Sequence, residues 1–286
     1  CMRRFIRKSI LFPICFLGAY MVVFISANAY LNRVFDSEGV IFVWGDSQAY
    51  QGVDLEELSN EIGKKVYTSA HHGAGVYDFL LFTERVPENS NVIVSISKLV
   101  QVRRKENDYN RSGLSFWAMK NLFKNGYSLS EIRTVVLKNI KPHSNISETT
   151  ELYAYADSMR IQLPLSHFRD YYQKIPIFLG DKQNLYLIGI ENLILKNCEM
   201  TFIEFPYHRE LESIENQSPI KKKTDDFIFR IGSLFNEFKT DTLWLSKDQN
   251  NFSDLSHLNS VGANQLSKQL GEKMTNNERT TMYIVR

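Results

Sequence analysis

Short runs of β-branched and aromatic residues recur along this chain, and stretches with helical spacing of apolar residues lie between them. The runs are nearly continuous rather than alternating, which is typical of parallel strands covered on both faces. The expected strands are Val40–Trp44, Lys65–Ser69, Asn91–Ser97, Glu199–Phe205 and Thr242–Ser246. Alternation of strand and helix with right-handed crossovers predicts an α/β fold, with three α/β/α layers around a parallel five-stranded sheet.

Amphipathic stretches predict the helices that cover this sheet, at Leu55–Ile62, Tyr77–Arg85 and Asp225–Phe238. The interval between the third and fourth strands, residues 98–198, is much longer than a single crossover needs. Its helical patterns are Leu114–Lys124, Leu129–Asn139, Ser147–Met159 and Gln183–Leu195. We therefore expect a helical insertion that forms a cap beside the sheet.

The N-terminal segment has the pattern of a membrane anchor. From Ser9 to Asn32 there is no charged residue, and about 20 apolar residues are enough to span a bilayer as a helix. The basic residues that precede this run are Arg3, Arg4, Arg7 and Lys8. The positive-inside rule then predicts a cytoplasmic tail (1–8), a transmembrane helix (9–32) and an extracytoplasmic domain (33–286).

Two other interpretations of the uncharged run stay open. Ala27-Asn28-Ala29 resembles a small-residue cleavage site, so the run can also be a signal peptide that is removed. It can also be a helix buried in a protein core, although a segment this apolar on all sides suits lipid better.

Charge and composition exclude several classes of function. The formal net charge is +2, but the first eight residues contribute four positive charges, and 30 basic against 32 acidic residues remain. A body this close to neutral lacks the basic surface of a nucleic-acid-binding protein. The three cysteines indicate no disulfide framework. No Cys/His cluster, phosphate-binding loop or dinucleotide fingerprint is present, so we expect neither a metal nor a cofactor.

The first expected strand ends in Gly45-Asp46-Ser47. In a parallel sheet, ligands bind beyond the carboxyl ends of the strands. Ser47 is therefore expected at a tight strand-to-helix turn, where backbone N–H groups point toward the group that it attacks. An ordinary turn is the alternative, since all three residue types are common in turns.

A second motif, Asp254-Leu-Ser-His257, follows the last expected strand. Residues three apart in one helical turn can touch, so the Asp254 carboxylate can approach the His257 imidazole. Such a pair fixes the tautomer of the ring and leaves its other nitrogen free to take a proton from a serine. Taken alone, the spacing is more typical of a polar surface or of a coincidental metal-ligand pattern.

The two motifs together resemble the first and last blocks of the SGNH (GDSL-like) hydrolase superfamily. GDSQ matches the first block, and DLSHLN followed by Gly262 matches the last, in the order Ser, Asp, His. The resemblance covers residues 38–275. It implies a flavodoxin-like α/β/α fold, with Ser47 as nucleophile, His257 as base and Asp254 as the partner of the base.

The middle blocks of the superfamily match less well. Its second block is a glycine after the second strand, which implies an oxyanion hole formed by the backbone N–H groups of Ser47 and Gly73, with Gly75 as the alternative glycine. Its third block, Gly-x-Asn-Asp, is replaced here by SISKL. Ser97 and Gln101 are the candidate substitutes for the missing asparagine donor.

Other residues are candidates for contact with substrate. Asp46, Gln48 and His72 lie beside these blocks, and Tyr207, His208 and Arg209 end the fourth expected strand at the same edge of the sheet. Both His71 and His72 follow the second strand, and polar packing in that loop is the alternative role for at least one of them.

An anchored SGNH-like domain with an altered third block resembles one subgroup of the superfamily. It includes the D-alanyl-transfer protein of the teichoic-acid system and the alginate O-acetylation proteins. The resemblance implies an acyltransferase in the bacterial cytoplasmic membrane that acylates a polysaccharide or polymer, beside a polytopic membrane-bound O-acyltransferase. An extracytoplasmic carbohydrate or lipid esterase, and a catalytically inactive glycan-binding or scaffold module, are the alternatives.

The topology is open to a direct test. Protease added outside spheroplasts should digest the domain beyond Arg33 and leave the anchor in the membrane, because the basic cluster keeps residues 1–8 inside. A domain that stays protected until the membrane is lysed contradicts the predicted orientation.

Overall fold

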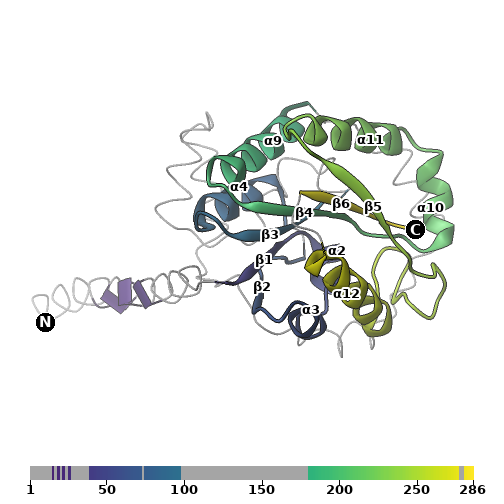
Figure 1. The fold of residues 1–286 in the computed structure, drawn as a ribbon, viewed down its shortest axis with the longest axis horizontal. Coiled ribbons are helices and arrows are strands. Elements are labelled where there is room, and N and C mark those ends of the chain that lie inside the picture. Colours follow the sequence, from purple (N-terminus) through teal and green to yellow (C-terminus); the bar gives the residue numbers. More distant parts are fainter. Residues whose placement is uncertain are drawn as a thin grey trace, which may run out of the picture. The chain divides into compact units, whose positions relative to one another are not determined.

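The computed structural model describes residues 39–72, 74–97, 180–276 and 280–286, together with seven residues between Cys15 and Ser26. The chain divides into two compact units, residues 1–37 with 113–144 and residues 38–112 with 145–286. The second unit contains the sheet and all the helices and strands named below (Figure 1).

Six parallel strands form one sheet in the order β2-β1-β3-β4-β6-β5. They are β1 (Ile41–Trp44), β2 (Val66–Thr68), β3 (Asn91–Ser95), β4 (Glu199–Glu204), β5 (Lys239–Leu243) and β6 (Thr281–Val285). The predicted α/β class with a parallel sheet is confirmed. Because all strands run in one direction, their carboxyl ends share one edge of the sheet.

The prediction of five strands is wrong, because the described residues contain six. The missed strand is β6, which lies between β4 and β5. The strand expected at Thr242–Ser246 is found as Lys239–Leu243. β5 is an edge strand, and the side chains at its beginning are polar and exposed. Because its apolar residues lie only at its end, the sequence pattern placed the strand too late in the chain.

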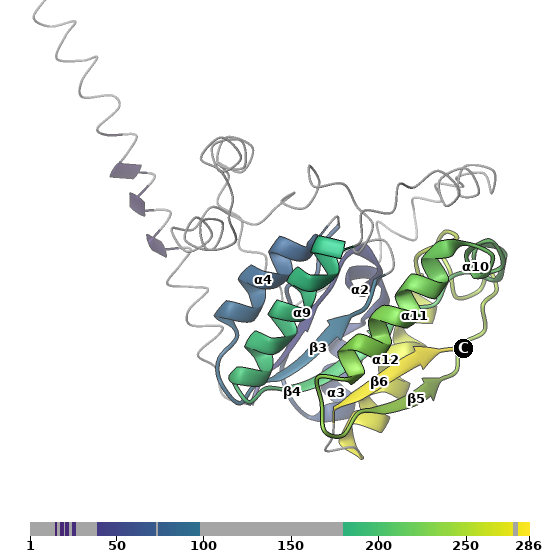
Figure 2. The ribbon, with the colours of Figure 1, turned by 90° about the horizontal axis from the view of Figure 1, so that it is seen from above.

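Helices cover both faces of the sheet (Figure 2). One face carries α4 (Val76–Arg85), α9 (Gly180–Leu195) and α11 (Pro219–Gly232). The other carries α3 (Leu55–Ile62) and α12 (Ser260–Thr275), which pack against each other. Two further helices, α2 (Ser47–Gly52) and α10 (Arg209–Asn216), follow the carboxyl ends of β1 and β4.

The two faces of the sheet have different cores. Toward α3 and α12 the core is mainly aliphatic, with Leu58, Ile93 and Leu266 at most 1% exposed. Toward α4 and α9 it is aromatic: the ring centroid of Trp44 lies 4.5 Å from that of Phe79 and 5.6 Å from that of Tyr186. Each of these fully buried side chains contributes on the order of 2 kcal/mol of hydrophobic free energy.

The predicted helices differ from the observed ones mostly at their ends. Leu55–Ile62 is confirmed as α3, and Tyr77–Arg85 corresponds to α4. The helix expected at Asp225–Phe238 begins earlier, because Pro219 at the first helical position favours a start there.

The pattern at Gln183–Leu195, expected within the cap, corresponds to α9. This helix packs against α4 on the face of the sheet, so it belongs to the layer that covers the sheet. The other helices expected in the insertion, between residues 98 and 179, lie outside the described residues.

Of the expected anchor, the structure describes only seven residues between Cys15 and Ser26, all helical and exposed. A search of the described residues finds no helix that combines the length and the hydropathy required to cross a bilayer. The assignment of residues 9–32 as an anchor therefore stays a prediction.

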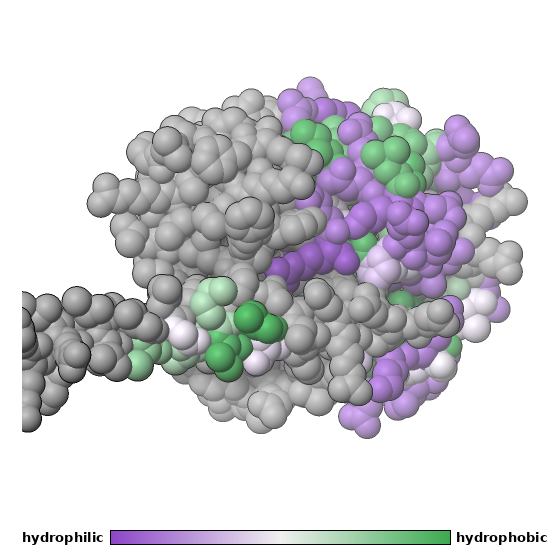
Figure 3. Space-filling view, turned by 90° about the vertical axis from the view of Figure 1, so that its left-hand side faces the viewer, coloured by the Kyte–Doolittle hydropathy of each residue, from purple (hydrophilic) through white to green (hydrophobic). Residues whose placement is uncertain are grey.

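Figure 3 shows one side of the molecule coloured by hydropathy. Where the residues are described, this face is mainly hydrophilic, with smaller hydrophobic groups between the polar ones. The exposed large hydrophobic side chains of the second unit include Ile188, Leu195, Phe229, Trp244 and Val261.

Candidate active site

The turn after β1 presents Ser47 at the first position of α2. The preceding residue, Asp46, caps this helix: its Oδ1 accepts the backbone N–H of Gln48 at 3.0 Å. Gly45 allows the tight approach, because a Cβ at this position would collide with the Cβ atoms of Ala49 and Ser95. Close packing thus explains the glycine, and the helix cap explains the aspartate. The serine is the first residue of α2.

The second motif lies in a loop between β5 and α12, and not in the helical turn that the spacing predicted. An isolated bridge between Phe252 and Leu258 closes the loop. Inside it, Oδ1 of Asp254 accepts the backbone N–H groups of Ser256 and His257 at 2.7 and 2.9 Å. The aspartate therefore shapes its own loop, as aspartates do in turns.

These two elements bring Ser47, His257 and Asp254 into one chain of hydrogen bonds. The Oγ of Ser47 lies 2.9 Å from Nε2 of His257. On the other side of the ring, Nδ1 lies 2.8 Å from Oδ2 of Asp254. Residues 210 positions apart in the sequence thus meet at the carboxyl edge of the sheet, in the order that serine catalysis requires.

The chemistry of the partners determines the proton positions in this chain. An ionised carboxylate only accepts hydrogen bonds, so Nδ1 of His257 carries the hydrogen and donates it to Asp254. Nε2 is then left to accept the hydroxyl hydrogen of Ser47. Burial by itself raises the pKa of Asp254, but the hydrogen bond and charge of His257 and the hydrogen bonds from Ser256 outweigh it and lower the pKa.

The start of α12 holds the loop from the other side. Asn259 caps this helix, and its side chain accepts the N–H of Gly262 at 2.9 Å. The backbone carbonyl of Asn251 lies where a Cβ of Gly262 would be, so this position needs glycine. Gly262 therefore allows the loop to pack closely on α12.

Sequence reasoning missed Ser256, which lies between the two residues of the motif. Its hydroxyl donates to Oδ1 of Asp254 at 2.9 Å and lies 3.0 Å from Nδ1 of His257. Its carbonyl accepts the side-chain N–H of Gln48 at 3.2 Å. This last hydrogen bond joins α2, which carries Ser47, to the loop that carries His257. No spacing rule pointed to it.

Ser97, a candidate oxyanion donor, has a different partner in this structure. Its hydroxyl donates to Oδ2 of Asp46 at 2.6 Å. Both residues are at most 2% exposed. The segment after β3 thus supplies a hydroxyl that holds the capping Asp46 in front of Ser47.

The oxyanion donors expected from the sequence are described only in part. The backbone N–H of Ser47 opens α2, where the first N–H groups of a helix have no partner within it. Gly73 and Gln101 lie outside the described residues. The N–H of Gly75 donates to Asp78 at 2.9 Å, so it already has an acceptor in the protein.

The remaining candidates for substrate contact lie around the site and contact protein groups. Asp46 and Gln48 are buried and make the hydrogen bonds given above. The ring of His72 packs edge-on against Tyr50 of α2, with centroids 5.2 Å apart. The backbone N–H groups of His208 and Arg209 donate to the carbonyls of Leu255 and Lys247, in the segment between β5 and α12. His208 also caps α10 with its side chain.

Two further observations bear on identity. Among the described residues, no three His, Cys, Asp or Glu side chains are grouped as ligands of a metal ion. No family model matches the chain, and no curated protein matches its sequence.

The contact between Ser97 and Asp46 leads to a stability prediction with a matched control. Ser97→Ala should lower the free energy of unfolding by about 1–3 kcal/mol, because it removes a hydrogen bond from a buried carboxylate. Ser95→Ala is the control, since Ser95 is equally buried and its hydroxyl has no partner among the described residues. Denaturant unfolding of both variants measures the difference, and equal losses of stability contradict the assigned contact.

The lowered pKa of Asp254 predicts a pH effect on stability. The unfolded chain holds this proton with an ordinary pKa of about 4, and the folded chain holds it more weakly. The ionised carboxylate therefore stabilises the fold above about pH 4, and this stabilisation is lost as the pH falls through the folded value. Asp254→Asn should lose less stability than the wild type on acidification from about pH 5 to pH 3.

Unfolding midpoints measured across this range test the effect. Asp226→Asn, on the exposed side of α11, is the matched control and should follow the wild-type curve. A curve for Asp254→Asn parallel to that of the wild type speaks against an ionised Asp254 in the fold.

Proposed function

We propose that this chain is a membrane-anchored serine enzyme of the SGNH type that transfers an acyl group to a cell-surface or exported polysaccharide. The observation that carries the proposal is the chain of hydrogen bonds from Ser47 through His257 to Asp254. Two distances of 2.9 and 2.8 Å on opposite nitrogens of one imidazole are typical of an activated nucleophile. The two sequence blocks that carry these residues support the SGNH type, with its three-layer flavodoxin-like architecture.

The proposed reaction has two stages. Ser47 Oγ attacks the carbonyl carbon of the donor while its proton moves to Nε2 of His257, and His257 then protonates the leaving group. An acyl ester on Ser47 results. A hydroxyl of the acceptor next gives its proton to His257 and attacks the same carbonyl. The bond between the acyl group and Ser47 Oγ breaks, His257 returns the proton to Ser47 Oγ, and the acyl group stays on the acceptor.

Asp254 stabilises the imidazolium that forms in each stage. The developing oxyanion needs donors in the site, and removal of one such donor typically costs about 3 kcal/mol of transition-state stabilisation. The N–H of Ser47 is our first candidate, and Gly73 remains the expected second.

The preference for transfer over hydrolysis depends on the expected anchor. Only eight residues, 33–40, separate residue 32 from β1, so the catalytic domain would stay close to the bilayer. Such a tether raises the effective concentration of a membrane-borne acyl donor or partner. We propose a polytopic membrane-bound O-acyltransferase as that partner, with a bacterial cytoplasmic membrane as the location and the N-terminus inside.

An esterase shares the first stage of this chemistry and differs only in using water in the second. An inactive glycan-binding or scaffold module requires no nucleophile. The complete hydrogen-bond chain favours an active enzyme over such a module.

A fluorophosphonate probe separates an active serine enzyme from an inactive module. The wild-type protein should form a covalent adduct at Ser47, because His257 accepts the proton of its hydroxyl. Ser47→Ala should abolish the adduct, and His257→Ala should slow it by orders of magnitude. Ser246→Ala is a matched control at a serine of the adjoining loop that faces Asp248, and it should react like the wild type. Labelling that survives in folded Ser47→Ala protein rules out the proposed nucleophile.

The direction of acyl flow decides between transferase and esterase. Deletion of the chain should leave an envelope polymer with fewer acyl esters, measured by release of the acyl groups with mild base. The wild-type chain should restore them, and the Ser47→Ala chain should not. More acyl groups after deletion would mean that the protein removes them.

A further inference from the structure

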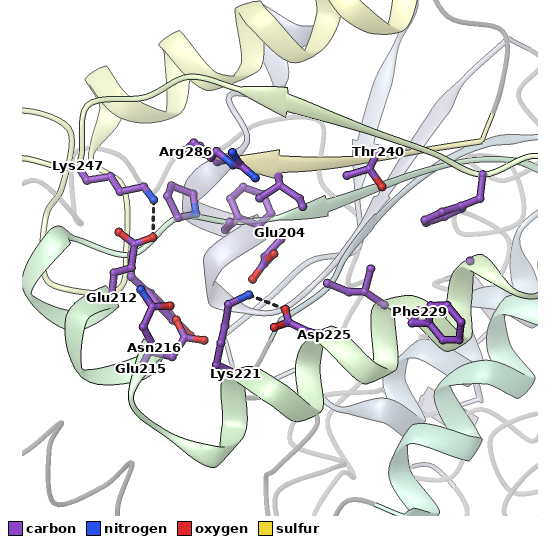
Figure 4. A pocket seen from close by; sticks show the side chains of 18 of the residues that line it. Glu204, Glu212, Glu215, Asn216, Lys221, Asp225, Phe229, Thr240, Lys247 and Arg286 are labelled. Atoms are coloured by element: carbon purple, nitrogen blue, oxygen red, sulfur yellow. Dashed lines mark hydrogen bonds and ion pairs between the residues drawn. The ribbon is translucent and has the colours of Figure 1, made fainter.

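A cavity of about 750 Å³ lies between α10, α11 and the strands β4, β6 and β5 (Figure 4). This volume is within the usual range for sites that bind small molecules or single units of a polymer. The catalytic residues Ser47, Asp254 and His257 do not line it, so it is separate from the site described above.

Acidic side chains form much of its polar lining. Glu204, at the end of β4, is 6% exposed, whereas Glu215 of α10 is 0% exposed and offers no accessible surface to a ligand. Ionised carboxylates only accept hydrogen bonds. A ligand that reaches Glu204 must therefore offer donors, such as hydroxyl or ammonium groups.

The basic side chains of the lining are already engaged in part. The Nζ of Lys221 lies 2.5 Å from Oδ1 of Asp225, and the Nζ of Lys247 lies 2.6 Å from Oε1 of Glu212 (Figure 4). With Arg286, the lining contains four acidic and three basic side chains, a formal charge of −1. This balance disfavours a polyanionic ligand, such as a polyuronate or a polyol phosphate, and permits a neutral or cationic one.

The cavity also has an exposed aromatic wall. The side chain of Phe229 is 79% exposed, although large hydrophobic residues are usually buried. Phe238 and Ile228 line the same cavity and extend its apolar part. An exposed ring beside acceptors and donors suits a ligand with an apolar face and polar edges, which is the character of a sugar ring.

The lining is connected to the catalytic loop. Lys247 lines the cavity, and its carbonyl accepts the N–H of Arg209 at the start of α10. Tyr207, also in the lining, precedes His208, whose N–H donates to Leu255 of the catalytic loop. A polymer chain held in the cavity would therefore lie next to the loop that carries the base.

We propose that this cavity binds a neutral or amino sugar unit of the acceptor polysaccharide. The carboxylate of Glu204 accepts hydroxyl or ammonium hydrogens of the sugar, and Phe229 packs against the apolar face of the ring. The part that this binding plays in acyl transfer rests on the proposed function, whereas the binding itself does not.

An oligosaccharide array tests the binding without catalysis. The full-length Ser47→Ala protein in detergent is applied to immobilised neutral, amino, uronic and phosphorylated oligosaccharides. It should be retained by neutral or amino sugars and not by the uronic and phosphorylated ones. Because this protein has no nucleophile, the result is independent of the serine mechanism, which the fluorophosphonate experiment tests separately.

Substitutions then assign the retention to the cavity. Phe229→Ala should weaken it by at least about tenfold, because an aromatic side chain that contacts a ligand often dominates its affinity. Trp244→Ala is the matched control, since Trp244 is 67% exposed and does not line the cavity. Glu204→Gln, checked for folding by circular dichroism, should also weaken retention. Retention by no sugar, retention only by anionic sugars, or equal retention by Phe229→Ala and Trp244→Ala would overturn the proposal.

Discussion

The geometry of the loop that carries His257 depends on the hydrogen bonds to the carboxylate of Asp254. It accepts the ring N–H of His257 and, in addition, the backbone N–H groups of Ser256 and His257. The same group therefore folds the loop and orients the imidazole. Charge-assisted hydrogen bonds of this kind are about twice as strong as neutral ones. His257 lies in neither a helix nor a strand, so these hydrogen bonds position it.

A second carboxylate, that of the buried Asp46, has the corresponding role for Ser47. Asp46 caps α2 through its Oδ1 and is held by Ser97 through its Oδ2. The side chain of Gln48 then joins α2 to the carbonyl of Ser256. Each half of the site is thus positioned by a carboxylate with defined donors, and the bond from Gln48 to Ser256 joins the halves in addition to the one between Ser47 and His257. Supporting contacts of this kind keep a nucleophile and its base within reaction distance.

The sequence predicted the parts of this arrangement that depend on local patterns. The strand ending at Trp44 and the helix Leu55–Ile62 were predicted because their burial produces continuous or periodic apolar residues. The site blocks were found through short motifs. Ser256 was missed because its role arises from the shape of a loop, and the partner of Ser97 was missed because it comes from another strand. Contacts between distant segments leave no periodic signal in the sequence.

The unpredicted strand β6 also explains the cavity between the sheet, α10 and α11. Because β6 is inserted between β4 and β5, the sheet is one strand wider on this side than predicted. The end of β6, at Ile284, Val285 and Arg286, forms part of the cavity lining together with residues of α11 and β5. The cavity therefore lies where α10 and α11 face the part of the sheet that β6 adds. Its lining reaches Lys247, so the same segment that leads into the catalytic loop also borders the proposed sugar site.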